Sequence, residues 1–515
     1  MPLDVSLDVS MRIGTDETVR VLLEVTERMD YRALNASYGR ESKAEEATPK
    51  QMFQLTVLGY MDRTHSLRRL EMACRNDIRY MYILNGKPAP DHNKFWRFIK
   101  HHLQGDVAEG LFYQLVTMLE ERGEISYAHV FVDGTKIEAN ANRYSFVWSK
   151  SVTKHEARLD EKMVVMFKDL AVRYPMTGIG AEQGAETWLE CLYRLKAENA
   201  VEFVYGRGKR KTQLQRDVEM LESYWERKRQ YADCKRILRG RNSFSKTDRD
   251  ATFMRMKEDH MKNGQLKPGY NLQLAVEGEY IVGVDISSER SDQTTLLPLL
   301  DRMAKGNGGK RHTCVVADAG YESEENYLGV RQRGQLAYIK PQNYEKSKSR
   351  KYRTNGYLRE NMPYDPGADT YRCPAGATFT HSYDTKRRSK TGFESTVSIY
   401  DCAACGDCPQ KKLCTRAEGN RRLSLSKQFV SLREQALERI TTKTGKMLRL
   451  NRSIQSEGAF GVLKQDHSFR RFSRRGEAGV FVETLLHAMA YNLNKLHAKS
   501  LKCRSGCTLH ELSSA

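Results

Sequence analysis

Two short apolar segments that each run into an aspartate constrain the fold of this chain most. Val130, Phe131 and Val132 are consecutive and apolar, which is typical of a strand buried on both faces, and this strand is expected to end at Asp133. A second apolar run, in HTCVVADAGY, ends at Asp318 just before the expected start of a helix. Buried strands among helical segments predict an α/β fold, with these two carboxylates at one edge of its sheet.

Helical periodicity dominates much of the remaining chain. Residues 46–122 carry apolar residues at helical spacing and predict a compact helical domain. Residues 151–264 are charged and mostly helical in pattern, and their apolar stripe of Leu214, Val218 and Leu221 indicates packing against a neighbouring helix. The basic runs in this stretch could follow a phosphate backbone or could be solvated surface.

Further elements are expected in the second half of the chain. Residues 268–286 are typical of two strands joined by a tight turn. A short strand is expected in QLAYIKP, and helices are expected over 450–466 and 479–497. Asp292 precedes an apolar helical run, so it is expected either to cap that helix or to support an active site nearby.

The charge of the chain favours a polyanionic partner. Lys and Arg number 85 against 65 Asp and Glu, which gives a net charge of +20. Nucleic acid is the first candidate, because neutralised phosphates release counterions, and a basic ribosome-associated or membrane-surface protein is the alternative. The first residues lack the pattern of a signal peptide and no apolar run is long enough for a membrane span, so a cytoplasmic protein is expected.

Three carboxylates stand out by their placement. Asp133 and Asp318 follow buried strands, and Glu457 lies in the helix expected around RSIQSEGAFGVLKQ. Three carboxylates at one edge of a sheet can hold hard divalent cations, which stabilise the attacking and leaving oxygens of a phosphoryl displacement. Taken singly, an Asp-Gly pair is usually a turn and a helix glutamate is usually a solvated charge.

The sequence segments around these carboxylates resemble those of a known family. FVDGTKIEANANRYSFVW, VVADAGYESEENY and RSIQSEGAFGVLKQDHSFRRFSRRGEAGVFVETLLHAMAYNLNKL are similar to the three blocks of a bacterial DDE transposase of the insertion-sequence 1182 group. The resemblance extends to TPKQMFQLTVLGYMDRTHSLRRLEMA, PDHNKFWRF, LKPGYNLQLAVEG and the cysteine block, and it spans most of residues 46–497. It implies an RNase H-like core, a mixed sheet flanked by helices, with insertions between its parts.

The resemblance also implies roles for individual residues. Asp133, Asp318 and Glu457 would be the catalytic residues and would hold two Mg²⁺ or Mn²⁺ ions. Lys464, seven residues after Glu457 and so on the same face of a straight helix, would contact DNA. The expected DNA-contacting residues also include Arg452, Arg470 and Arg471.

Two details of this helix depart from the expected arrangement. Arg452 lies five residues before Glu457, so an ideal helix would turn the arginine well away from the glutamate. Related groups carry a tyrosine three positions before this arginine, where the present chain has Arg449. A mechanism that needs that tyrosine to stack on a displaced base, such as a hairpin intermediate, is therefore not predicted.

Five of the eleven cysteines lie between residues 373 and 414. Cys402, Cys405, Cys408 and Cys414 occur in CAACGDCPQKKLC, with Cys373 upstream. Closely spaced CxxC steps favour structural zinc with four thiolate ligands, and an iron–sulfur cluster or unligated thiols are the alternatives. Five cysteines for four positions leave the ligand set open.

The sequence therefore predicts a transposase that binds the terminal inverted repeats of its own mobile element and cleaves and joins double-stranded DNA, including target DNA. A homodimer or higher oligomer is expected when two ends are paired, in a bacterial cytoplasm and on the nucleoid when DNA is bound. A transposase-derived DNA-binding regulator and an RNase H-like nuclease without strand transfer are the alternatives. The expected segments are an N-terminal segment (1–45), a helical DNA-binding domain (46–122), the first part of the catalytic core (123–150), a basic helical insertion (151–264), the second part of the core (265–344), a cysteine-rich insertion (345–436), core helices with Glu457 (437–499) and a tail (500–515).

Overall fold

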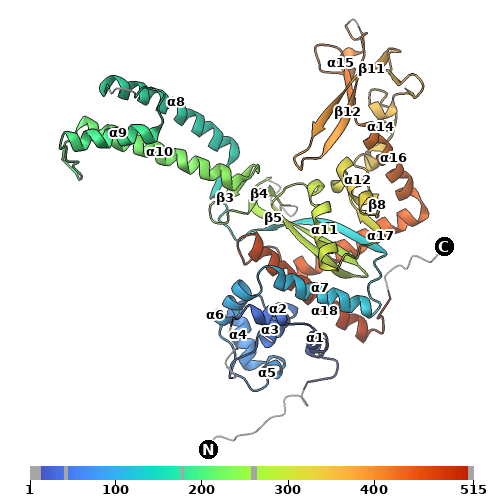
Figure 1. Ribbon diagram of the computed structural model, residues 1–515. Helices are drawn as coiled ribbons and strands as arrows, with labels where there is room; N and C mark the ends of the chain where they lie inside the picture. The colour runs from blue at the N-terminus through green and yellow to red at the C-terminus, as the bar shows by residue number, and fades with distance from the viewer. Residues whose placement is uncertain (1–12, 40–44, 176–178, 257–263, 407, 508–515) are drawn as a thin grey trace, which may run out of the picture. The chain divides into compact units, whose positions relative to one another are not determined.

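The computed structural model describes residues 13–39, 45–175, 179–256, 264–406 and 408–507 (Figure 1). The chain divides into two compact units. One unit combines Met1–Ile137 with Asn271–Ala515, and the other is Glu138–Tyr270. The mixed α/β character expected from the sequence is confirmed, with a mixed sheet flanked by helices and a helical N-terminal region.

Seven helices form the N-terminal region. Two of them fall in the first 45 residues, where the sequence pattern is weak. Helix α3 is buried on all sides, and Thr48 begins it with a capping box in which the Thr48 side chain accepts from the Gln51 amide. Asp91 caps α6 by accepting from the amide of Lys94, so the predicted helix start is confirmed. The helices are α1 (Thr18–Glu27), α2 (Arg32–Ala36), α3 (Pro49–Met61), α4 (Leu67–Asn76), α5 (Ile78–Leu84), α6 (His92–Arg97) and α7 (Asp106–Glu121).

A mixed sheet lies at the centre of the first unit. Its central strand β1 (His129–Glu138) pairs in parallel with β7 (Cys314–Ala317), which pairs in parallel with β8 (Leu336–Ile339). On its other side β1 neighbours β5 (Leu266–Glu277), and β5 forms the predicted hairpin with β6 (Tyr280–Ser287). The sheet is therefore mixed: β1, β7 and β8 are parallel to one another, and the β5–β6 hairpin is antiparallel.

Strand β1 differs from the prediction in its end point. It was expected to end at Asp133-Gly134, but it continues through both residues to Glu138. The strand continues because β5 is long enough to accompany it, and the amide of Ala139, just beyond β1, still donates to the carbonyl of Pro268. Asp133 is therefore an inward-facing residue within a strand, 9% exposed, and not a turn residue.

Helices cover this sheet. The side chain of Leu448 packs on Phe131 and Val316, which places α17 (Lys443–Gly461) on the face of the sheet that also carries Asp133. The side chain of Asn492, in α18 (Glu477–Leu501), donates to and accepts from the backbone of Ile281 in β6. The other covering helices are α11 (Leu296–Gly306), α12 (Glu324–Gln332) and α16 (Lys427–Thr441).

The helix predicted over 450–466 is not a single α-helix. α17 ends at Gly461, and Val462–Asp466 form a π-helical turn. A π turn holds more residues than an α turn, so seven residues no longer return a side chain to the same face. The straight-helix argument that placed Lys464 on the face of Glu457 is therefore wrong.

The second unit is a helical arm with short strands at its base. The helices α8 (Ser149–Arg173), α9 (Ala185–Glu198) and α10 (Gln213–Leu238) pack around Trp188, which is fully buried. The predicted stripe of Leu214, Val218 and Leu221 lies in this core, so its packing role is confirmed. The strands are β2 (Phe146–Trp148), β3 (Ser243–Ser245) and β4 (Thr252–Arg255), of which β4 pairs with the start of β5.

The cysteine-bearing segment forms a second sheet. Its five strands are antiparallel and follow the order β13–β12–β11–β10–β9. The strands are β9 (Tyr364–Asp365), β10 (Thr370–Arg372), β11 (Thr378–Arg388), β12 (Glu394–Asp401) and β13 (Arg422–Leu425). Cys402 and Cys405 lie in the small core of this sheet with Tyr371, Phe379 and Tyr400.

None of the described helices is long and apolar enough to cross a membrane.

Candidate functional site

Two predicted carboxylates lie on neighbouring parallel strands. The last paired residues of β1 and β7 in their shared register are Val132 and Ala317, and Asp133 and Asp318 follow directly after them. The two aspartates are therefore neighbours on the sheet, as the sequence predicts for strands that end at the same edge. The Asp318 side chain also accepts from the amide of Gly320 at 2.7 Å and so caps a short 3-10 turn, Ala319–Tyr321.

Asp292 lies beside Asp318. Its Oδ1 accepts from Asn271 Nδ2 at 2.7 Å and from Gln273 Nε2 at 3.2 Å. The 3-10 turn that begins at Asp292 is instead capped by the Ser291 side chain, which accepts from the Gln293 amide. The expectation that Asp292 caps the helix is therefore wrong. The other expectation, that it lies near the candidate active site, agrees with the structure.

Two glycines allow this close approach. A methyl group on Gly320 would lie 3.0 Å from Asp318 Oδ1 and 3.3 Å from Asp292 Oδ2. The two carboxylates therefore have oxygen atoms no more than 6.3 Å apart, the sum of those distances. A methyl group on Gly134 would lie 2.9 Å from Asp292 Oδ1, 2.5 Å from Gln273 Nε2 and 3.0 Å from the Tyr321 hydroxyl. Real side chains do not tolerate such contacts, so glycine is required at residue 134 for steric reasons.

Tyr321 lies beneath the three aspartates. It is fully buried, and its hydroxyl donates to Gln273 Oε1. Burial raises the pKa of this phenol well above its usual value, and the negative charges of Asp292, Asp133 and Asp318 raise the pKa further. The hydroxyl therefore stays protonated and keeps the hydrogen that it donates to Gln273, whose side chain in turn donates to Asp292.

Sequence reasoning missed Asn271, Gln273 and Tyr321. Asn271 and Gln273 are 1% and 0% exposed and alternate with apolar residues along β5, so they share one face of the strand. Two amides on a buried face need buried partners. The pattern YNLQLAV carries this signal, although it does not say which residue the amides bind.

The helix α17 brings Arg452 to the site. Arg452 Nη1 lies 3.3 Å from Asp133 Oδ2, and the side chains are 16% and 13% exposed. The helix begins at Lys443, before Arg452, and its arginine-bearing face meets β1. Glu457 is exposed, and it makes no hydrogen bond or ion pair with the described residues.

The other basic residues predicted to contact DNA follow the π turn. Lys464 is half-buried, and Arg470 and Arg471 are exposed. The guanidinium of Arg470 donates to the carbonyl of Lys464 and to Gln465 Oε1 at 2.6 Å. These contacts hold a basic loop together between α17 and α18.

The five clustered cysteines line one enclosed cavity of about 20 Å³. The Arg421 guanidinium donates to Cys414 Sγ at 2.9 Å, and its amide donates to Cys405 Sγ at 3.5 Å. Burial raises the pKa of the Cys402 thiol to about 11, and the neighbouring Cys405 and Cys373 raise it further. Over the part of the chain that the structure describes, no three His, Cys, Asp or Glu side chains are arranged to hold a metal ion.

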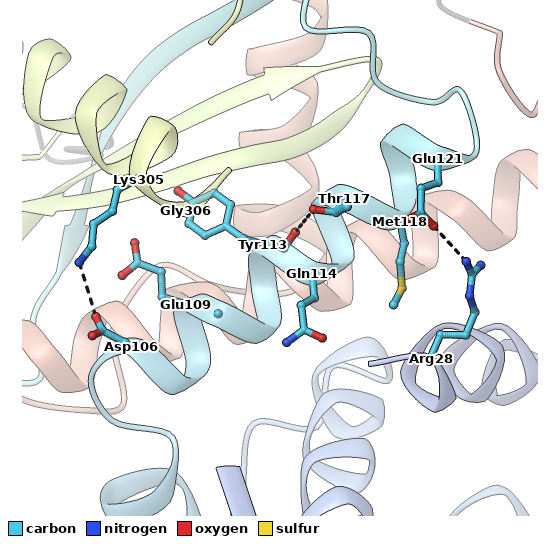
Figure 2. Close-up of a pocket in the computed structure, with 11 residues that line it drawn as sticks. Arg28, Asp106, Glu109, Tyr113, Gln114, Thr117, Met118, Glu121, Lys305 and Gly306 are labelled. Atoms are coloured by element: carbon cyan, nitrogen blue, oxygen red, sulfur yellow. Dashed lines mark hydrogen bonds and ion pairs between the residues drawn. The ribbon is translucent and has the colours of Figure 1, made fainter. Parts of the chain in front are cut away.

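A separate cavity of about 510 Å³ lies against α7 (Figure 2). Its other walls are Arg28, which follows α1, and the C-terminal end of α11. Ion pairs join its walls: Arg28 to Glu121 at 2.9 Å, and Lys305 to Asp106 at 3.9 Å. None of the predicted catalytic, DNA-contacting or cysteine residues lines it. Its fifth charged group, Glu109, pairs with Arg302 at 3.3 Å, so each charged group of the cavity has a partner, and the aspartate cluster remains the candidate site.

Two parts of the chain match known families. Residues 372–497 match the family described as Transposase DDE domain. Residues 9–101 match the family described as Transposase domain (DUF772). The first match contains Glu457 and the cysteine block, and neither match contains Asp133 or Asp318. No curated protein and no solved structure gives a match.

Proposed function

We propose that this protein is a DNA transposase of the DDE type, of the insertion-sequence 1182 group, that binds the terminal inverted repeats of its element and catalyses strand cleavage and strand transfer. The observation that carries the proposal is the placement of Asp133 and Asp318 side by side on parallel strands, with Asp292 beside Asp318, in a chain with two transposase-family matches. The mixed sheet and its flanking helices agree with the RNase H-like core that we propose for the catalytic part.

The aspartate cluster suits divalent cations in its donor chemistry. Its side chains supply carboxylate oxygens, which Mg²⁺ and Mn²⁺ prefer. Asp133 and Asp318, with Glu457 from α17, would hold two such ions, and Asp292 adds a fourth carboxylate beside Asp318. Bound ions would supply charge neutralisation at the phosphate and a lowered pKa for water.

The residues of the chain would position the DNA strand. Arg452 orients the Asp133 carboxylate and brings a cation to the place where a phosphodiester would approach it. Asn271 and Gln273 fix Asp292 through its Oδ1 and leave Oδ2 directed toward Gly320 and Asp318. The loop with Lys464, Arg470 and Arg471 would bind the backbone of the same DNA through its positive charge.

The remaining parts of the proposal concern the other segments. The N-terminal helices would read the terminal repeats, and the helical arm in 151–264 would follow the DNA backbone. Two paired ends imply a homodimer or a higher oligomer. The protein would act in the bacterial cytoplasm, and on the nucleoid when it is bound to DNA.

We also propose structural zinc in the cysteine-bearing sheet. The five thiols line one small cavity, and Arg421 donates to two of the sulfurs, from its guanidinium to Cys414 and from its backbone amide to Cys405. Four of the five would be the ligands. Metal analysis of freshly purified protein is expected to give one zinc per chain, and protein that contains no zinc would rule the proposal out.

Labelled duplexes that carry the DNA flanking this gene test the proposed activity. The wild type is expected to cleave at the element ends and to join them to target DNA with Mg²⁺. Cleavage is expected to vanish in EDTA and in Asp318→Asn, while binding to the ends persists. The matched control is Asp301→Asn, an exposed aspartate on α11 that pairs only with Arg333.

The two alternatives give different results in the same assay. Cleavage without joining would indicate an RNase H-like nuclease. Specific end binding without cleavage under any divalent metal would indicate a DNA-binding regulator. Absence of both specific binding and cleavage would reject the proposed function.

A further inference from the structure

A cavity of about 530 Å³ lies beside the second sheet, away from the aspartate cluster. Its walls come from α13 (Tyr344–Ser347), α14 (Arg350–Arg353), α16 and the strands β9 and β10. This volume is within the range that holds a small organic ligand. Its lining is notable for aromatic rings and cations: Tyr344, Tyr352, Tyr364, Tyr371, Arg353, Arg359, Lys427 and Arg433.

One aromatic ring is presented at the rim with firm support behind it. Tyr364 is 43% exposed, and its ring packs on the buried Tyr371 with centroids 4.6 Å apart. Its hydroxyl donates to Asp369 at 2.8 Å, which fixes the ring in place. A ring held in this way offers a flat surface to a planar ligand at little entropic cost.

The cations of the cavity differ in how they are used. Arg433 is held by the buried Glu322 at 2.7 Å, and Lys427 is held by Asp369 at 2.8 Å. Arg359 pairs with its neighbour Glu360 at 3.2 Å, a partly exposed contact that a phosphate can displace. Arg353 is exposed, and no hydrogen bond or ion pair joins its side chain to the rest of the described chain.

The cavity connects with the aspartate cluster through α17. The guanidinium of Arg449 lies 4.8 Å from the ring centroid of Tyr344, which lines the cavity. Three residues later on the same helix, Arg452 pairs with Asp133. Residues three apart are neighbours on a helix surface, so one turn of α17 separates the cavity rim from the carboxylates.

We propose that this cavity binds an unpaired nucleotide of the DNA strand, with the base against Tyr364 and the flanking phosphates on Arg353 and Arg359. Aromatic rings interleaved with cations are the combination that binds single-stranded nucleic acid without sequence preference. The inference rests on the proposed function, because it assumes that DNA lies at the aspartate cluster one helical turn away.

The test measures binding of the full-length protein to a short single-stranded oligonucleotide in EDTA, so that cleavage plays no part. Anisotropy gives the affinity, and quenching of a single 2-aminopurine reports stacking on an aromatic ring. Tyr364→Ala is expected to weaken binding by about 5- to 100-fold and to abolish the quenching. Tyr364→Phe keeps the ring and is expected to retain both.

Two further variants keep the result interpretable. Arg353→Ala removes an exposed side chain, and it is expected to weaken binding and to lower its salt dependence. The control is Tyr383→Ala, a tyrosine of similar exposure (48%) on β11 that does not line the cavity. It is expected to leave affinity and quenching unchanged.

Unchanged affinity and quenching in both Tyr364→Ala and Arg353→Ala would overturn the inference. The inference would also be overturned if duplex DNA bound as tightly as the single strand and neither substitution changed its affinity. Failure of the proposed function has a different signature, because Asp318→Asn or an inactive wild type would still bind the oligonucleotide in EDTA. If the wild type cleaves and joins DNA but the cavity variants bind the oligonucleotide normally, only the proposal about the cavity is rejected.

Discussion

Asp292 is the residue whose role changes most between sequence and structure. In the sequence it precedes an apolar helix, but in the structure it accepts from Asn271 and Gln273 and lies beside Asp318. An aspartate that receives two amide donors is held in one orientation. Its remaining oxygen then contributes to the negative field in which Asp133 and Asp318 act.

Asp292→Asn tests this role at the level of one atom. The amide would present an N–H group to the two amide donors or to Asp318, so the carboxylate cluster would lose its alignment. Removal of a supporting partner of this kind lowers metal affinity or activity by about 10- to 100-fold. The expected result is slower cleavage that is partly restored by more Mg²⁺, whereas a variant with the wild-type rate at every Mg²⁺ concentration would contradict the assignment.

Gly134→Ala tests the packing of the same site. The added methyl would meet Gln273, Asp292 and Tyr321 at 3.0 Å or less, and these side chains are fixed by their hydrogen bonds. Overpacking of a well-packed region costs about 1–3 kcal/mol in the free energy of unfolding. Urea denaturation measures the loss, and Gly110→Ala in α7, which meets nothing within 4 Å, is the matched control. Equal stability of the two variants would show that the site can relax.

Three histidines, of which His467 and His487 are buried and His65 is half-buried, join elements that lie far apart in the sequence. His65 follows α3, His467 follows the π turn and His487 lies in α18. The ring centroids of His65 and His487 are 4.9 Å apart, and His65 Nε2 lies 2.7 Å from the carbonyl oxygen of His467. This cluster connects the N-terminal helices to the basic loop after α17.

The cluster predicts acid sensitivity. Burial lowers the pKa of His467 to about 4, and burial lowers the pKa values of His65 and His487 as well. The folded protein therefore keeps these rings neutral, while the unfolded chain binds protons below about pH 6.5. The resulting stability is present above that pH and is lost as the pH falls toward 4, by up to about 3 kcal/mol for His467 alone.

Urea denaturation at a series of pH values measures this loss. His467→Gln cannot take up the proton, so its free energy of unfolding is expected to fall less between about pH 6.5 and pH 4.5. His155→Gln, at an exposed position in α8, is expected to follow the wild type. Parallel curves for His467→Gln and the wild type would show that the cluster does not control acid stability.

The charge of the whole molecule sets how binding depends on salt. A net charge of +20 implies many phosphate contacts, and each contact releases counterions. Affinity for duplex DNA is expected to fall by about 10³-fold or more between low and physiological salt. Arg470→Ala and Arg471→Ala, each of which removes one exposed cation, are expected to reduce the slope of log affinity against log salt by about 1. A slope that stays at the wild-type value in both variants would exclude this loop from the DNA contact.

The sequence by itself determined the local elements and the residue types of the site. Apolar periodicity predicted the helices of residues 46–122, the β5–β6 hairpin, the core stripe of α10 and the helix α18, because each depends on neighbours along the chain, but it did not predict α1 and α2. The sequence segments around the two aspartates placed Asp318 correctly after a buried strand, whereas Asp133 lies within β1 and not at its end. The two aspartates are neighbours because β1 and β7 pair in parallel, and consecutive buried strands in the sequence can suggest such a pairing.

The tertiary structure decided which side chains meet. Asp292 and Asp318 lie within 6.3 Å because Gly320 leaves room between them, and Arg452 reaches Asp133 because Leu448 seats α17 on Phe131 and Val316. These contacts depend on packing between elements distant in the chain, and no periodicity reports such packing. The π turn after Gly461 is a similar case, because Gly458 and Gly461 weaken the helix locally but do not say that a π turn follows.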